Sequence, residues 1–208
     1  MREPNLVMRS WLGSGSINII GKPNSGKDLH SEVIAPEFDA VVLGAGKKLR
    51  ADADMDTRDR ALMEAGVLIP SDTFFAKMFH QFQNPELVGK PFFLTAVGRV
   101  AGEPQPVADI LRAAQHPLRA VIHVVISDEI ARQRRGNRGD RPDDSPEAFE
   151  VRLEEFATKT LPAIEEYRSI LGEVIEIDGD APRHIVTGNI RSELARLSGL
   201  DPSELIAF

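Results

Sequence analysis

The stretch that decides the fold is Gly21-Lys22-Pro23-Asn24-Ser25-Gly26-Lys27, which follows the short apolar run INII at residues 17–20. It fits the pattern G-x-x-x-x-G-K, placed after a predicted strand and before a predicted helix. Glycine at both ends lets the backbone curl, so that successive N–H groups can point at phosphate oxygens. The helix N-terminus adds a partial positive charge, and Lys27 adds a full one. We therefore predict a loop that cradles the phosphates of a nucleoside triphosphate.

The residues after this loop differ from the usual pattern. Most loops of this kind end in Ser or Thr, whose hydroxyl helps to hold magnesium. Here Asp28 and Leu29 follow Lys27 instead. The alternative interpretation is a glycine-rich turn between a strand and a helix, with a solvated lysine, and the motif alone leaves it open.

Short apolar segments alternate with helix-length patterns along the rest of the chain. Aliphatic and β-branched runs predict strands over residues 17–20, 40–43, 91–97, 120–126 and 173–177. Periodic apolar positions predict helices from residue 28 onward and over residues 55–65, 71–82, 105–114, 145–171 and 183–197. This alternation predicts an α/β fold, a doubly wound five-stranded parallel sheet flanked by helices, with ligands at the carboxyl ends of the strands.

Composition bounds the domain organisation and the classes of partner. The chain has 208 residues, and we predict one domain over residues 17–208 with residues 1–16 as a flexible N-terminal extension. The net charge of -7 argues against a nucleic-acid-binding surface. Cysteine is absent, so disulfides are excluded and a reducing compartment is permitted. No apolar run approaches the roughly 20 residues of a membrane helix, and we expect a cytoplasmic protein with no membrane partner.

Arginines crowd one short stretch of this acidic chain, at Arg132, Arg134, Arg135, Arg138 and Arg141. Guanidinium groups bind phosphate oxygens bidentately and keep their charge, which suits a site that closes around a transferring phosphoryl group. The segment 136–144 (GNRGDRPDD) has no periodicity and predicts an exposed loop. We interpret residues 132–144 as a short mobile lid. The alternative is a solvated basic face at the end of a helix.

The order of these features resembles the adenylate kinase family of nucleoside monophosphate kinases, which have the P-loop NTPase fold. The loop GKPNSGKD is similar to the family's GxPGSGKG pattern. The later matches are Leu49-Arg50, GVLIPSD at 66–72, TAVGR at 95–99 with the following Gln105, and RPDD at 141–144 with the following Arg152. The resemblance covers almost all of residues 17–197, and the short loop is similar to the family's short-lid form.

The resemblance implies transfer of the γ-phosphoryl group of ATP, with Mg²⁺, to a nucleoside monophosphate such as AMP. It implies catalytic roles for Lys27, Arg99, Arg135, Arg141 and Arg152. It implies that ATP is bound by Gly21, Pro23, Asn24, Ser25, Gly26, Lys27, Asp28, Leu29 and Arg132. The monophosphate-binding region would lie at residues 45–85, and the acceptor would be bound by Gly46, Arg50, Val67, Ile69, Gly98, Arg99 and Gln105. The implied partners are small-molecule nucleotides, bound by a monomer or a small homo-oligomer.

The sequence departs from the family pattern at the magnesium and acceptor positions. Thr95 stands where the family has the aspartate that organises magnesium-bound water, so no metal ligand is assigned. Gln105 lies two residues further from Arg99 than is usual. Two alternatives follow. One is a nucleotide-binding module with weakened catalysis, favoured by Asp28 and Thr95, and the other is a kinase of the same fold with a different small-molecule acceptor, favoured by Lys47.

Overall fold

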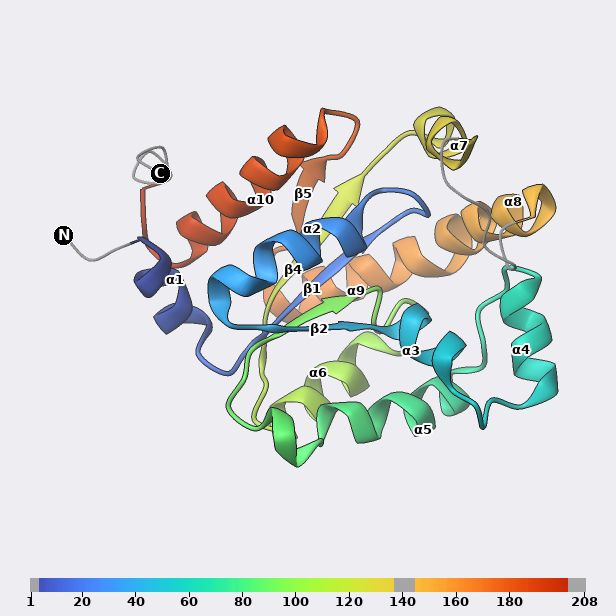
Figure 1. Ribbon diagram of the computed structural model, residues 1–208, viewed down its shortest axis with the longest axis horizontal. Helices are drawn as coiled ribbons and strands as arrows, with labels where there is room; N and C mark the ends of the chain where they lie inside the picture. Colours follow the sequence, from blue (N-terminus) through green and yellow to red (C-terminus); the bar gives the residue numbers. More distant parts are fainter. Residues whose placement is uncertain (1–3, 137–144, 202–208) are drawn as a thin grey trace.

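The computed structural model describes residues 4–136 and 145–201, and its centre is a five-stranded sheet (Figure 1). The strands are β1 (Ser16–Gly21), β2 (Val41–Gly44), β3 (Phe92–Thr95), β4 (Leu118–Val125) and β5 (Ile175–Asp178). Their spatial order is β2-β3-β1-β4-β5, and each neighbouring pair is parallel. The predicted parallel sheet is therefore confirmed, and each of these strands overlaps a predicted one.

The central strand β1 delivers the chain to the phosphate loop. All of its residues are buried, as expected for a strand covered on both faces. Ile19 pairs with Thr95 of β3 on one side and with Ile122 of β4 on the other. Thr95 also pairs with Gly44 of β2. Because the strands are parallel, their carboxyl ends meet at one edge of the sheet, where the loop begins at Gly21.

Helices cover both faces of the sheet, and each face has its own hydrophobic core. One core lies under α1 (Pro4–Leu12), α2 (Lys27–Ile34), the 3-10 helix η1 (Ala35–Phe38) and α10 (Arg183–Leu197). The other lies under α5 (Ser71–Phe82), α6 (Pro104–Ala113) and α9 (Leu161–Leu171). Ile19 belongs to the first core and Ile20 to the second, because successive strand residues point to opposite faces.

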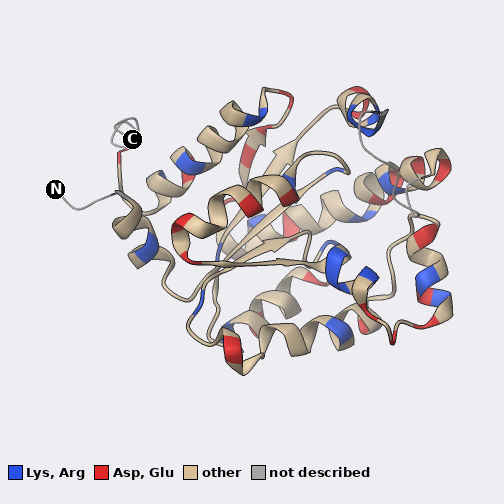
Figure 2. Cartoon of the chain, in the orientation of Figure 1, with Lys and Arg blue, Asp and Glu red and all other residues tan. Residues whose placement is uncertain are grey.

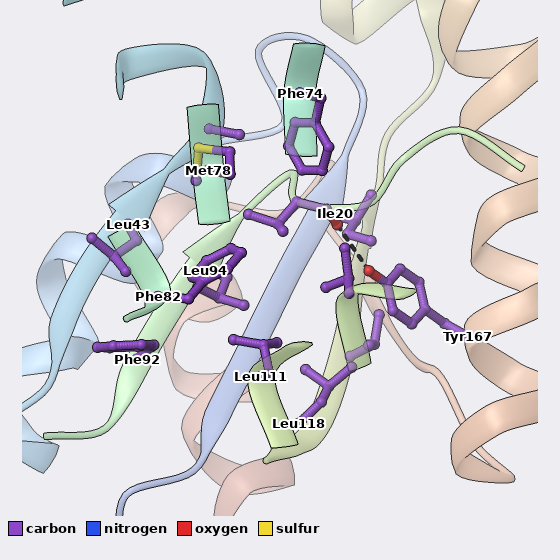
Figure 3. Packing of buried hydrophobic residues seen from close by; sticks show 14 of the residues in the cluster. Ile20, Leu43, Phe74, Met78, Phe82, Phe92, Leu94, Leu111, Leu118 and Tyr167 are labelled. Atoms are coloured by element: carbon purple, nitrogen blue, oxygen red, sulfur yellow. Dashed lines mark hydrogen bonds between the residues drawn. The ribbon is translucent and has the colours of Figure 1, made fainter. Parts of the chain in front are cut away.

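Several aromatic side chains pack among the aliphatic ones in the core under α5, α6 and α9 (Figure 3). Phe82 of α5, Phe92 of β3 and Tyr167 of α9 are almost completely buried. A buried tyrosine hydroxyl needs a hydrogen-bond partner, and that of Tyr167 donates to the backbone oxygen of Val97 at 3.0 Å. The amide of Asn18 in β1 donates to the same oxygen at 2.8 Å. These bonds fix the backbone that follows β3, next to the candidate site.

The remaining α-helices of the described chain gather at the carboxyl edge of the sheet, at the right of Figure 1. They are α3 (Ala45–Ala51), α4 (Thr57–Glu64), α7 (Asp128–Gly136) and α8 (Pro146–Glu155). A π-helical segment, Phe156–Thr160, joins α8 to α9, so the predicted helix over residues 145–171 is interrupted. Such segments are frequent at functional sites. A short 3-10 helix, η2 (Pro85–Leu87), precedes β3.

Most of the predicted lid at residues 132–144 lies outside the described residues. Its first part, residues 132–136, forms the end of α7. Across residues 4–136 and 145–201, no helix is long and apolar enough to cross a membrane.

The N-terminal segment differs from the flexible extension predicted for residues 1–16. Helix α1 spans Pro4–Leu12, and Ser16 already belongs to β1. Met8 and Leu12, one helical turn apart, are buried in the core that α10 also covers. Arg9 donates to the backbone oxygen of Glu37 in η1. The prediction was wrong for residues 4–16. Met8 and Leu12 form too short an apolar face to indicate a helix by themselves, and they are buried only because α10 and η1 pack beside them.

Candidate active site

The phosphate loop joins the end of β1 to the start of α2. Gly21 ends the strand and Lys27 begins the helix. Asn24 and Gly26 have positive φ angles of 63° and 90°, which curl the backbone between them. A side chain does not fit at Gly21, because its Cβ would lie 2.6 Å from Ser25 Oγ and 2.7 Å from a backbone oxygen of β4. The strand-to-helix context predicted for the loop is confirmed.

A cavity of about 460 Å³ lies beside the loop. Pockets of a few hundred cubic ångströms hold small organic ligands. Its wall is built from the loop, the starts of α2, α3 and α10, the segment after β3, and the junction of α8 with α9. Residues predicted to bind the donor and residues predicted to bind the acceptor line this one cavity. They are Gly21, Pro23, Asn24, Ser25, Gly26, Lys27, Asp28, Leu29, Gly46, Arg50, Val67, Ile69, Arg99 and Arg152.

Part of the cavity wall is apolar. These side chains come from α3, α4, α5 and the connection between α4 and α5, and they are Leu49, Met63, Val67, Ile69 and Phe74. Ligand pockets typically combine such a lining with a few polar groups that fix orientation. A flat aromatic ring such as a nucleobase would bury its faces against this wall.

Arg99 lies partly buried in the cavity wall, a few residues after β3. Burial is the main cause that lowers the pKa of its guanidinium to about 10. The nearby charge of Glu103 opposes this effect, while the positive charges of Arg152 and Arg50 lower the pKa further. The group remains cationic at neutral pH. Three guanidinium charges that interact across one cavity favour a polyanionic ligand, and a phosphate dianion can accept bidentate bonds from each.

Asp28 and Thr95 contact each other beside Lys27. Thr95 Oγ1 donates to Asp28 Oδ1 at 2.8 Å, and Asp28 Oδ2 lies 4.0 Å from Lys27 Nζ. The Asp28 side chain is 56% exposed, and the residue lines the cavity. Gly44 leaves room for the pair, since a Cβ there would lie 2.8 Å from Thr95 Oγ1. The carboxylate of Asp28, near the start of α2, thus lies beside Thr95, the last residue of β3.

This pair fits a magnesium ion that arrives with a nucleotide. Mg²⁺ takes oxygen ligands and is commonly held through one or two carboxylates plus substrate phosphates and water, rather than by a cage of protein groups. In the part of the chain that the structure describes, no group of three His, Asp or Glu side chains could hold a metal ion. The Asp28 carboxylate, which accepts a hydrogen bond from Thr95 beside Lys27, has the chemistry to hold the ion in this way.

Two residues predicted to bind the acceptor, Gln105 and Gly98, are not among the cavity lining. Gln105 is exposed on α6, where its amide donates to Asp109 at 3.0 Å. Gly98 is buried with a φ angle of 62°, and a Cβ there would lie 2.3 Å from the Tyr167 hydroxyl. Gly98 therefore serves a tight backbone turn. Glu103, rather than Gln105, lines the cavity.

The arginine segment brings a different residue to the cavity from those predicted. Arg134 lines it and donates to the backbone oxygen of Asn24 in the loop at 3.4 Å. Arg132 instead pairs with a glutamate of α8 at 2.8 Å, and the guanidinium of Arg135 lies 5.7 Å from the centroid of a phenylalanine ring of α8. Arg141 lies outside the described residues. Figure 2 shows that α3 and α7 both contain Lys or Arg residues.

Three other charged residues of the cavity, Glu103, Glu155 and Arg183, were not singled out from the sequence. Glu155 accepts a hydrogen bond from the backbone N–H of Leu68 at 3.1 Å and so ties the acceptor-side segment to α8. The sequence did hold a clue to Glu103. Gln105 lies two residues further along the chain from Arg99 than is usual, and Glu103 stands at the usual spacing. No comparable signal marks Arg183.

Known proteins match this chain over most of its length. The adenylate kinase family model matches residues 19–171. An adenylate kinase of Agrobacterium fabrum is 30% identical over 192 residues, which cover 86% of this chain and 97% of that protein. Adenylate kinases of a Chelativorans species and of Oenococcus oeni are 28% and 24% identical, covering 86% and 88% of this chain and 97% and 100% of their own lengths. The chain therefore belongs to the adenylate kinase family.

Proposed function

We propose that this chain transfers the γ-phosphoryl group of ATP to a nucleoside monophosphate inside the cavity beside the phosphate loop. Membership of the family makes the chain an ATP-dependent phosphotransferase. One observation carries the assignment of the site, namely that two phosphate-binding sets line the same cavity. These are the loop that ends in Lys27, and the group Arg50, Arg99 and Arg152. A protein that only bound a triphosphate would need the loop alone.

The loop supports binding of the donor. Its curled backbone and the N-terminus of α2 direct N–H groups toward phosphate oxygens. Lys27 adds the full positive charge. Arg134, which donates to the loop backbone, adds a second charge from α7. Asp28 with Thr95 would hold Mg²⁺, which neutralises charge on the bound phosphates when it is present.

The arginine group supports binding of the acceptor phosphate. Arg50 comes from α3, Arg99 from the segment after β3, and Arg152 from α8, so three parts of the chain bring a guanidinium group to one cavity. Planar guanidinium groups fix a phosphate in orientation as well as in position. The apolar wall near Val67 and Ile69 would cover the base.

The reaction needs positioning more than covalent chemistry. An oxygen of the acceptor phosphate attacks the γ-phosphorus, and the bond from that phosphorus to the bridging oxygen breaks. ADP leaves with the electron pair of the broken bond, so two diphosphates result and no enzyme intermediate forms. Alignment of the two phosphates and neutralisation of their charge supply the rate enhancement.

A coupled assay of ADP formation, run with ATP and each of AMP, GMP, CMP and UMP, tests this proposal. We expect turnover that requires both nucleotides and saturates with each. ATP alone should give at most slow hydrolysis. If calorimetry detects ATP binding but no monophosphate binds or reacts, the chain is a nucleotide-binding module instead. The contact between Asp28 and Thr95 favours the enzyme, because it supplies the oxygen ligand that the sequence pattern lacks.

A further inference from the structure

Glu103 is a buried carboxylate in the wall of the cavity. It immediately precedes α6, and only 3% of the residue is exposed. Glutamate is rarely buried to this extent unless donors surround its carboxylate. Two donors are present. The hydroxyl of Ser71 donates to Oε1 at 2.6 Å, and the backbone N–H of Val100 donates to Oε2 at 3.1 Å.

These two hydrogen bonds orient the carboxylate but do not use all of its capacity to accept hydrogen bonds. A carboxylate has about four lone-pair sites and no donor, so each oxygen of Glu103 keeps an accepting direction. A ligand that places N–H groups there gains charge-assisted hydrogen bonds. A ligand that places a lone pair there is repelled by the carboxylate and gains no hydrogen bond from it.

We propose that Glu103 reads the base of the acceptor and selects a base with two adjacent N–H donors, which makes guanosine monophosphate the preferred acceptor. The inference rests on the proposed function, because it names the acceptor of the same site. It follows from the position of Glu103 in the cavity that also contains Arg50 and Arg99. The arginines hold the phosphate, and the carboxylate distinguishes the base.

The hydrogen-bonding edges of the common bases explain the preference. Guanine alone presents two neighbouring donors, N1–H and the N2 amino group, which match both oxygens of one carboxylate. Adenine and cytosine each place a ring-nitrogen lone pair beside their amino group, so that one carboxylate oxygen would face an acceptor. Uracil has a single N–H between two carbonyl oxygens. A bidentate contact also fixes the base in its plane, while Val67 and Ile69 contribute apolar surface.

The position of Gln105 supports the same conclusion. An amide side chain offers a donor and an acceptor together, which would suit adenine. The amide of Gln105 is exposed on α6 and donates to Asp109, away from the cavity lining. In the described part of the site, Glu103 and Glu155 are the carboxylates near the acceptor side, and Glu155 is bonded to Leu68 N–H and to Lys159.

Calorimetry of the whole chain with AMP, GMP, CMP and UMP tests the inference. We expect GMP to bind about ten- to a hundredfold more tightly than AMP, as is typical of one bidentate contact between a side chain and a base. Glu103→Gln should weaken GMP binding and strengthen AMP binding, so that the preference falls or reverses. Its affinity for ATP should stay unchanged, which confirms that the variant is folded.

Gln105→Ala is the matched control and should leave the ratio of GMP to AMP affinity unchanged. If Glu103→Gln does not fold, Glu103→Asp keeps the charge but shortens its reach, and it should lower GMP affinity while preserving the order of the bases. Equal or tighter binding of AMP, CMP or UMP by the wild-type chain overturns the inference and leaves the proposed function intact. An unchanged ratio in a folded Glu103→Gln variant also overturns it. Absence of binding by all four monophosphates overturns the proposed function itself.

Discussion

The phosphate loop and helix α7 both bring positive charge to the cavity, but the sequence predicted their residues unequally well. In the loop, the glycines and Lys27 that the motif singled out all line the cavity. In α7, Arg134 lines it, whereas Arg132 and Arg135 contact α8. The loop directs its groups through its own backbone, whereas a helix presents whichever face its packing selects.

The packing that selects the face of α7 is a small core shared with α8. Ala131 is fully buried in it, together with Phe149 and Leu153. Arg134 lies three residues after Ala131 and therefore on nearly the same face of the helix. The amide of Asn24 donates to the backbone oxygen of Ala131 at 3.2 Å, which fixes the loop against α7. Once Ala131 is buried, Arg134 faces the loop and Arg132 points to α8.

The largest effect should come from the loop. Lys27→Ala should lower kcat/KM by about 100- to 1000-fold, the typical loss when one preorganised donor to the transition state is removed. Steady-state kinetics with ATP and the best monophosphate measures this. Lys22→Ala is the matched control, because Lys22 belongs to the same loop but pairs with Asp128 at 2.5 Å. Similar losses in the two variants would remove the distinction between loop residues that line the cavity and those that do not.

The next effect should separate the cavity arginines from those of α7. Arg99→Ala should raise the acceptor KM or lower kcat by about ten- to a hundredfold, because a charge-assisted hydrogen bond typically contributes about 1.5 to 3 kcal/mol. ATP affinity should stay nearly unchanged, and Arg99→Lys should rescue poorly, since a point charge cannot replace the planar fork. Arg132→Ala, which breaks an exposed ion pair with α8, should change the same constants by less than about threefold. Equal losses for Arg99→Ala and Arg132→Ala would contradict the observed orientation of α7.

A smaller effect should appear at the start of α2. Mg²⁺ should increase the affinity for ATP, and in Asp28→Asn this increase should be about tenfold smaller, because one charge-assisted contact is removed. Thr95→Val should have a smaller effect, about two- to tenfold, since it removes one neutral hydrogen bond to the carboxylate. Calorimetry of ATP binding with Mg²⁺ and with EDTA measures the gain directly. If Mg²⁺ increases the ATP affinity of Asp28→Asn as much as that of the wild-type chain, the Asp28 carboxylate does not bind the ion.

The smallest effect should report the coupling between α7 and the loop. His30 lies under the loop and hydrogen-bonds to Thr187 at 2.9 Å. Burial lowers the pKa of His30, and the charges of Arg134 and Arg183 lower it further. Arg134→Gln should therefore move the pKa of His30 upward, toward the ordinary value. Titration of the ring by NMR measures this, and an unmoved pKa would indicate that Arg134 does not face the loop.

The same shift has a consequence for stability. Because the pKa of His30 is lowered in the folded state, the unfolded chain binds this proton more readily. The corresponding stability is fully present above the ordinary histidine pKa of about 6.5 and is lost as the pH falls through the lowered value. The decline should be shallower in Arg134→Gln, as thermal unfolding at neutral and mildly acidic pH would measure.

Much of the fold was predictable because its elements are locally consistent. The apolar runs marked all the strands of the sheet, and the helices over residues 71–82 and 183–197 have the predicted boundaries. Three α-helices of the described residues were missed. Helix α1 depends on burial of Met8 and Leu12 by distant segments, whereas α3 and α7 are rich in charged residues and have few apolar positions. Periodicity detects a helix through its apolar face, and none of these segments offers a long one.

By itself, the sequence determined the parallel sheet and the phosphate loop that follows its central strand, because contiguous residues carry that information in backbone geometry and apolar pattern. The tertiary structure alone decided which polar side chains share the cavity. It placed Asp28 against Thr95, across the start of α2 and the end of β3, and it placed Glu103 rather than Gln105 in the wall. Such contacts join residues distant in the chain or select one face of a helix, and both depend on how the elements pack.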